Sequence, residues 1–251
     1  MFCDINPTCY KIALQKEICK RHIKNFLGHE VYAALYDTEP LPQLVSACSS
    51  HLIKRGKGIE PKLQENKAIN INLANQTMNG ILLRPGETFS FWKLVGKTTK
   101  RKGYQEGRVL VRSRILPGLG GGLCNLANTI HRVVLLSPLT VTEFHQHSDA
   151  LAPDEGERVP FSSGTSVVYN NGDYRFRNHT GQTFQLLLWC DADNLYAELR
   201  CEQPLPHCYR IVEEGHHFQK EGEKYYRVSK IYKETADKAS GQIIDKALVL
   251  D

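Results

Sequence analysis

The chain has 251 residues, of which 41% are hydrophobic and 24% are charged, and its formal net charge is +5. This balance is typical of globular proteins and excludes a disordered or fibrous one. The charge is too mild to indicate a nucleic-acid partner, so none is expected. No apolar stretch is long enough for a membrane span, and none is expected.

The N-terminal residues show no export pattern. Lys11, Lys16 and Lys20 interrupt the apolar positions, so a charged start followed by an apolar core and a cleavage site is lacking. From the sequence as written, we expect a cytoplasmic protein. The eight cysteines include no C-x-x-C pair. In a reducing compartment they are expected to be free thiols rather than disulfides.

The first sixty residues are predicted to form a helical, basic extension, and residues 61–251 a single α+β domain. Apolar residues recur at helical spacing from Thr8 to Leu35, among many lysines and histidines. A second helix is predicted over Asn66–Asn79, because Ile69, Leu73 and Met78 lie on or near one helical face. Gly80 follows as a stop signal.

Strand patterns follow. Ile81–Phe91 reads as a strand, a Pro-Gly turn and a second strand. Gly107–Leu116 alternates between two faces, which predicts one strand. The glycine-rich run of residues 117–122 is expected to be irregular.

Residues 123–136 have apolar side chains at i, i+3, i+4 and i+7, which predicts an amphipathic helix. Ser137-Pro138 ends it, and Leu139–His147 is the next strand candidate. From Val167 onward the pattern is mostly strands. The predicted class is therefore α+β, with early helices, one central helix and a β-rich second half.

Cys124 is the most informative residue, because it follows three glycines and lies in the first turn of the predicted central helix. A helix N-terminus presents partial positive charge and unpaired N–H groups, which favour a thiolate. The same groups could hold the oxyanion of an acyl-transfer intermediate, and we assign this loop to Gly121, Gly122 and Asn125. The alternative is a buried cysteine that only packs beside the glycines.

His145 and His147 share a face of the predicted strand with Glu143. Because the strand can fold back along the helix, its end is expected near Cys124. A cysteine, a histidine and an acid are the parts of a nucleophile, its base and an orienting group. Either histidine could be the base, and Glu143, Asp149 or Asp173 the orienting acid. A thiol with such a neighbour is expected to have a pKa well below about 8.5.

Several separate motifs together resemble the VanW family. They are Gln64-Glu65-Asn66-Lys67, Asn79-Gly80 with Arg84–Trp92, Gly120–Cys124 with Asn128, Glu143-x-His145-x-His147, and Arg177-Asn178-His179-Thr180. The resemblance covers about residues 41–200. The family is named after an accessory protein encoded with vancomycin-resistance genes, and some proteins with this domain are described as L,D-transpeptidases that cross-link peptidoglycan stem peptides.

The resemblance implies that Cys124 is an acyl-accepting nucleophile with His145 or His147 as its base, and that the substrate is a peptide or peptidoglycan precursor. No cofactor and no metal are expected. Asn125 stands where the family usually has Gln, and Phe144 where it commonly has Arg. These departures favour the alternative of a non-catalytic accessory or binding protein.

Three weaker patterns remain. Arg112 and Arg114 could bind a substrate carboxylate, although the pattern favours a solvated basic strand face. A metal-binding protein that uses His145, His147 and a cysteine is a third hypothesis. One further set of side chains could supply zinc ligands: Cys190, Cys201, His207 and Cys208. Their spacing in the sequence is not that of a structural zinc site.

Overall fold

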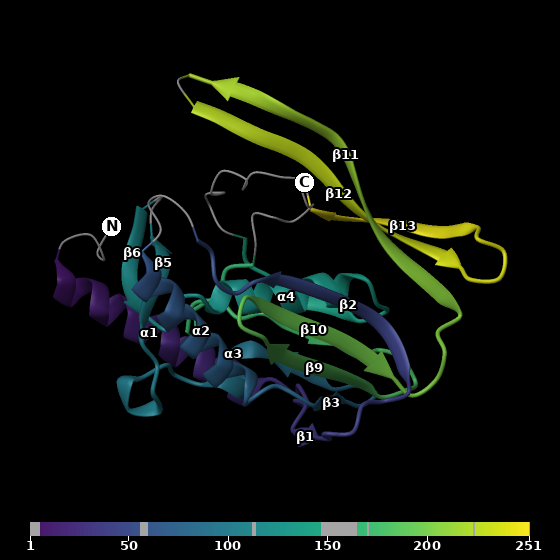
Figure 1. The fold of residues 1–251 in the computed structure, drawn as a ribbon, viewed down its shortest axis with the longest axis horizontal. Coiled ribbons are helices and arrows are strands. Elements are labelled where there is room, and N and C mark those ends of the chain that lie inside the picture. The colour runs from purple at the N-terminus through teal and green to yellow at the C-terminus, as the bar shows by residue number, and fades with distance from the viewer. Residues whose placement is uncertain are drawn as a thin grey trace.

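The computed structural model describes residues 6–55, 60–111, 114–146, 165–169, 171–222 and 224–250. Its helices are α1 (Pro7–Leu27), α2 (Pro61–Asn75), α3 (Phe91–Val95) and α4 (Leu123–Leu135), with a 3-10 turn η2 (Lys100–Lys102). Its strands are β1 (Leu35–Tyr36), β2 (Gln43–His51), β3 (Ile81–Leu83), β4 (Thr88–Ser90), β5 (Glu106–Val111), β6 (Arg114–Leu119), β7 (Thr140–Glu143), β8 (Arg175–Arg177), β9 (Phe184–Cys190), β10 (Asn194–Cys201), β11 (His207–Glu221), β12 (Lys224–Asp237) and β13 (Ile243–Leu250). These elements confirm the α+β class (Figure 1).

The central sheet is antiparallel and has the order β1-β3-β9-β10-β2. In β10, Leu195, Ala197 and Leu199 are buried and alternate with partly exposed residues, so one face of the sheet meets the core. Helix α4 packs on β2 and β10, and α2 packs on β9 and on α4. The apolar stripe of α4 thereby fills the core between sheet and helices.

A second, three-stranded sheet has the order β4-β8-β7 and lies beside α4. Phe89 of β4 and Phe176 of β8 are paired across the sheet, and their rings stack with centroids 4.6 Å apart. This small sheet matters for function because β7 leads directly to His145.

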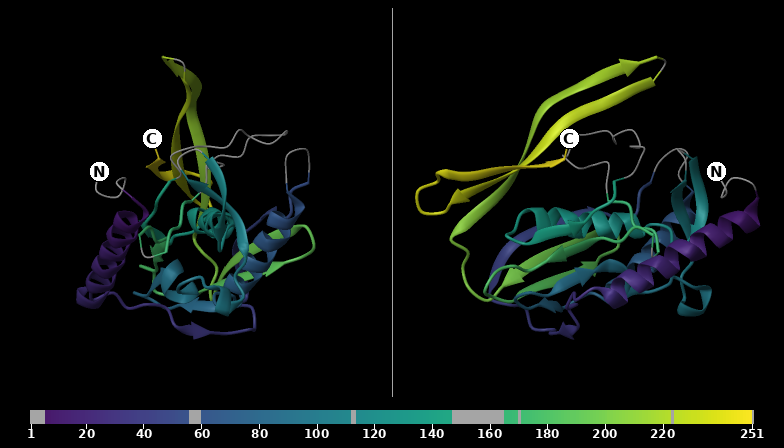
Figure 2. Two further views of the ribbon diagram at one scale, coloured as in Figure 1. Left: turned by 90° about the vertical axis from the view of Figure 1, so that its left-hand side faces the viewer. Right: turned by 180° about the vertical axis from the view of Figure 1, so that it is seen from behind.

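The third sheet, β11-β12-β13, extends away from the rest of the molecule as a long twisted ribbon (Figures 1 and 2). Its base is attached to the end of α4 through a small apolar cluster in which Leu135 and Ile231 are buried. Lys233 Nζ also donates a hydrogen bond to the carbonyl oxygen of Ser137. No helix in the described part of the chain is long and apolar enough to cross a membrane.

Two strand predictions were wrong in detail. The segment predicted as one strand, Gly107–Leu116, is the β5–β6 hairpin, in which Val111 pairs with Arg114. Pro117 and Gly118, expected to be irregular, belong to β6. A proline is tolerated there because a two-stranded ribbon has only edge strands, so no further strand needs its missing N–H.

Other boundaries also moved. The predicted strand Leu139–His147 ends at Glu143. The two strands predicted within Ile81–Phe91 form, but β3 joins the central sheet and β4 the second one. Among the described residues of the first sixty, α1 is the only helix, and the strands β1 and β2 join the central sheet. The division into domains at residue 60 stays a prediction.

Candidate active site

The glycines before α4 are required by close packing. Gly122, the N-cap of α4, has φ +103°, a conformation that favours glycine. A Cβ on Gly121 would lie 2.2 Å from the carbonyl carbon of Gly107, so the two backbones touch. Asn70 Nδ2 donates to the Gly121 carbonyl oxygen at 2.9 Å. The loop is therefore clamped between β5 and α2, and it fixes where α4 begins.

Cys124 is the second residue of α4, and it is partly buried against the core. The Val167 N–H donates to Cys124 Sγ at 3.5 Å, and the thiol donates to the Val167 carbonyl oxygen at 3.8 Å. Burial raises the pKa of the Cys124 thiol, and the backbone hydrogen bonds offset this only in part. The prediction of a lowered pKa was therefore wrong, because desolvation outweighs the helix N-terminus.

His145 lies just beyond β7 and is exposed. Its Nε2 is 2.9 Å from Glu143 Oε1. The His145 carbonyl oxygen accepts a hydrogen bond from the Ser166 N–H at 2.7 Å, and the next residue, Val167, is the one that contacts Cys124. The cysteine and the histidine therefore flank one short segment of chain. His147 lies outside the described residues.

Glu143 is the acid that contacts His145. Burial by itself would raise the pKa of Glu143, but hydrogen bonds from Arg21, His145 and the Asp173 N–H lower it to about 2. Both Arg21 Nη atoms lie 2.6 Å from the carboxylate oxygens, in a two-pronged ion pair. Glu143 is thus charged at neutral pH and can orient the imidazole.

Asp173, the second candidate acid, is buried, and both of its carboxylate oxygens accept hydrogen bonds. It accepts hydrogen bonds from Ser90 Oγ at 2.5 Å, from the Trp92 N–H at 3.0 Å and from Arg175 Nε at 2.7 Å. It therefore ties α3 to β8 rather than orienting a histidine. The third candidate, Asp149, lies outside the described residues.

Two arginines that the sequence analysis did not select hold this region together. Arg21 reaches Glu143 from α1, and Arg175 Nη2 donates to Asn25 Oδ1 of α1 at 2.8 Å. The Arg175 side chain is 6% exposed. The available signal was its position between the aromatic residues Tyr174 and Phe176, since a charged side chain among buried residues is ordinarily paired.

The remaining predicted residues are placed as follows. Asn125 Nδ2 donates to the His51 carbonyl oxygen at 3.3 Å, so its side chain is bonded to the end of β2. Arg114 begins β6, six residues before Gly120. At 3.3 Å per residue, this corresponds to about 20 Å of strand between the two residues. Arg112 lies outside the described residues.

The face of α4 that carries Cys124 continues through Asn128 and His131, at i+4 and i+7. His131 Nδ1 is 3.1 Å from the Tyr174 hydroxyl, and burial lowers the pKa of His131 to about 3, so the ring is neutral. Asn128 Oδ1 is buried without a hydrogen-bond partner, as is Thr165 Oγ1 in the segment that covers Cys124. Helical spacing from Cys124 was the signal that could have found Asn128 and His131.

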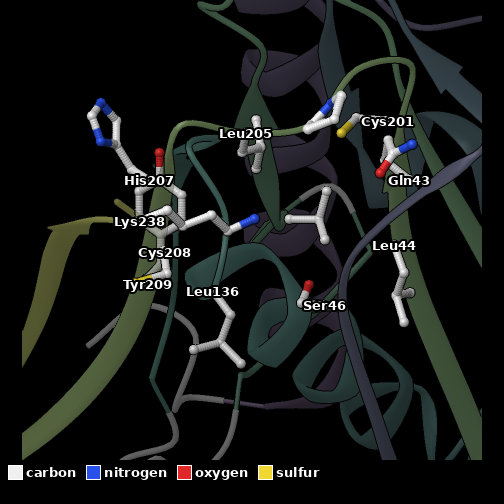
Figure 3. Close-up of a pocket in the computed structure, with 12 residues that line it drawn as sticks. Gln43, Leu44, Ser46, Leu136, Cys201, Leu205, His207, Cys208, Tyr209 and Lys238 are labelled. Atoms are coloured by element: carbon white, nitrogen blue, oxygen red, sulfur yellow. The ribbon is translucent and has the colours of Figure 1, made fainter. Parts of the chain in front are cut away.

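A cavity of about 200 Å³ lies at the other end of α4, where β2 meets the start of β11 (Figure 3). Cys201 is separated across it from His207 and Cys208, while Cys190 accepts a hydrogen bond from Asn75 Nδ2. These four side chains therefore do not meet around one point as zinc ligands. Within the described ranges, no three histidine, cysteine or acidic side chains are grouped to hold a metal.

Comparison with known proteins identifies the family. A family model described as "VanW like protein" matches residues 66–200. This chain belongs to the VanW family. The "Vancomycin B-type resistance protein VanW" of Enterococcus faecalis (strain ATCC 700802 / V583) is 28% identical over 237 residues, which cover 94% of this chain and 85% of that protein. The "Uncharacterized protein YoaR" of Bacillus subtilis (strain 168) is 28% identical over 118 residues, 47% of this chain and 37% of that protein. No solved structure matches.

Much of the family-like sequence has a structural role. The carboxylate of Glu87 accepts hydrogen bonds from the Arg84 N–H at 2.9 Å and from its guanidinium, which closes the Pro-Gly turn. Asn178 is buried and donates to the carbonyl oxygens of Leu83 and Gln182, both at 2.8 Å. These motifs therefore hold the sheets in register, and the candidate chemistry is concentrated at Cys124, His145 and Glu143.

Proposed function

We propose that this VanW-family chain is a cysteine-dependent acyl transferase or hydrolase that acts on peptidoglycan-type peptides, in a process linked to glycopeptide resistance. The link to resistance comes from the name of the enterococcal relative. The chemistry is supported by one observation: Cys124 and the His145–Glu143 pair contact neighbouring residues of the same short segment.

In the proposed reaction, the sulfur of Cys124 attacks an amide carbonyl carbon of the peptide. Because its thiol pKa is raised, the proton leaves during the attack and passes to a histidine, for which His145 is the described candidate. N–H groups at the start of α4 stabilise the tetrahedral oxyanion. The histidine returns the proton to the leaving amine as the C–N bond breaks, and a thioester remains. An incoming amine or water then releases the acyl group and restores the thiol.

Two buried oxygens without partners also favour a polar ligand near the cysteine. Asn128 Oδ1 and Thr165 Oγ1 are each left without a hydrogen bond, and buried polar atoms are ordinarily satisfied by protein, water or ligand. Amide N–H groups of a peptide substrate are donors of the kind that these oxygens lack.

A second candidate function is that of a non-catalytic accessory protein, and the surroundings of Cys124 favour it. The Val167 main chain engages Cys124 Sγ through both its N–H and its carbonyl, and burial raises the thiol pKa. These are features of a structural thiol. In that case the fold would bind a peptide or a protein without forming a thioester.

Trapping the thioester separates the two functions. The purified protein is incubated with a peptidoglycan stem tetrapeptide, quenched in acid and mapped by mass spectrometry. The acyl transferase predicts an acyl adduct on Cys124 that Cys124→Ala abolishes. Cys48→Ala is the matched control, since Cys48 is another partly buried thiol with a raised pKa, and it should keep the adduct.

Two further variants complete the test. His145→Asn removes an exposed imidazole and should slow adduct formation at least about a hundredfold if His145 is the base. In cells, Cys124→Ala should change muropeptide composition as a deletion does. An adduct on no cysteine, together with unchanged muropeptides in cells carrying Cys124→Ala, would establish the accessory function.

A further inference from the structure

Helix α1 has an outer face that is exposed among the residues that the structure describes. Figure 2 shows α1, in purple, lying along the outside of the molecule. Its apolar side chains Ile12, Ile23, Phe26 and Leu27 are 55%, 58%, 88% and 68% exposed. At 100° per residue, Ile12, Cys19, Ile23, Phe26 and Leu27 fall within an arc of about 100°. They form one outer apolar stripe along the helix.

The opposite side of α1 is attached to the body of the protein. Arg21, about 180° from Ile12, forms the ion pair with Glu143, and Asn25 accepts the hydrogen bond from Arg175. Leu14 and Ile18 on this side are partly buried. The contacts fix the rotation of the helix about its axis, so the outer stripe is held facing solvent.

The charge of α1 identifies what would cover this stripe. The helix contains five lysine or arginine residues and one acidic residue, Glu17. Lys16, Lys20 and Lys24 follow one flank of the stripe, at about 40°, 80° and 120° from Ile12. A second copy of the chain would bring these like charges together. An anionic lipid surface would complement the lysines and accept the apolar side chains.

We propose that the outer face of α1 is a peripheral membrane-binding surface that recognises bilayers with anionic lipids. Ile12, Ile23, Phe26 and Leu27 enter the boundary between head groups and acyl chains, and the lysine flank lies against the lipid phosphates. The helix rests in the plane of the interface and does not span it. The polar contacts of Arg21 and Asn25 keep the body of the protein on the aqueous side.

Vesicle sedimentation with the full chain tests the proposal. Vesicles of phosphatidylglycerol and phosphatidylcholine in equal parts should bind the protein, and vesicles of pure phosphatidylcholine should bind it at least tenfold more weakly. Raising NaCl from 0.1 to 0.5 M should also weaken binding, because the Debye length shortens. Equal binding to both kinds of vesicle, or binding to neither, would overturn the proposal.

Matched variants assign the binding to α1. The variant Ile23→Ser/Phe26→Ser should lose at least tenfold in binding, with an unchanged melting temperature because both side chains are exposed. Ile244→Ser/Phe218→Ser removes the same two residue types from the C-terminal sheet, where they are 52% and 66% exposed, and should bind like the wild type. Equal loss in both variants would refute a specific role for α1. A dimer that dissociates in the α1 variant, seen by light scattering without vesicle binding, would show that a second copy covers the stripe.

Discussion

Single residues around Cys124 have precise tasks, and Gly121 in the loop before α4 shows this most clearly. Gly121 is one of the residues that the sequence analysis assigned to an oxyanion loop. Its first task is steric, because the backbone of Gly107 occupies the space that any side chain would need. The oxyanion role stays a prediction, whereas the packing role follows directly from the distance.

Gly121→Ala should therefore destabilise the protein by about 3 kcal/mol, at the upper end of the cost of overpacking. The new Cβ would meet backbone atoms at 2.2 Å, and a backbone cannot rotate away as a side chain can. Urea denaturation measures the change. Gly181→Ala is the control, because a Cβ there meets nothing within 4 Å. Equal stability of the two variants would contradict the steric argument.

At the scale of elements, the attachment of α1 depends on the ionised carboxylate of Glu143. Its pKa is about 2 in the folded protein and 4.5 in the reference state. A carboxyl group with a lowered folded pKa contributes stability that is present above the unfolded value and is lost as the pH falls. For Glu143 that window extends from about pH 4.5 down to about pH 2.

Glu143→Gln should accordingly reduce stability at pH 7 and flatten the loss of stability between pH 5 and pH 3. Urea midpoints measured at each pH give both quantities. The control is Glu65→Gln, which removes a carboxylate from an exposed ion pair with Lys62 on α2, and such pairs contribute little. A Glu143→Gln profile parallel to that of the wild type would show that Glu143 is not the group that titrates.

On the scale of the whole molecule, the C-terminal sheet is joined to the body by few apolar contacts. Ile231 and Leu135 are the buried members of that contact, with Ile211, Val249 and Leu250 packed around them. The larger core lies elsewhere, between the central sheet and the helices α2 and α4. The ribbon can therefore lose its anchor while the body stays folded.

Ile231→Ala should loosen the base of the ribbon by about 2 kcal/mol, at the low end for a core truncation because the cluster is small. Hydrogen exchange should then show faster exchange over residues 207–250, with unchanged protection over 61–201. Ile244→Ala, at a position in the same sheet that is 52% exposed, should leave both regions unaffected. Faster exchange throughout the body would mean that the two parts unfold together.

The elements that sequence predicted well are those encoded by neighbouring residues. The i, i+3, i+4 spacing after Gly122 predicted α4 to within one residue of its end at Leu135, since helical periodicity is a local property. The same pattern placed Cys124 in the first turn, and the E-x-H spacing brought Glu143 and His145 together.

Only the tertiary structure decided the contacts between residues that are distant in sequence, and the pKa shifts that these contacts cause. Arg21 and Glu143 pair across 122 positions of sequence, and Val167 covers Cys124 from 43 positions away. Burial would raise the pKa of Glu143, and the first contact helps to lower it. At Cys124, burial around the second contact reverses the expected shift. Burial depends on which segments fold over a side chain, and local spacing carries no record of that.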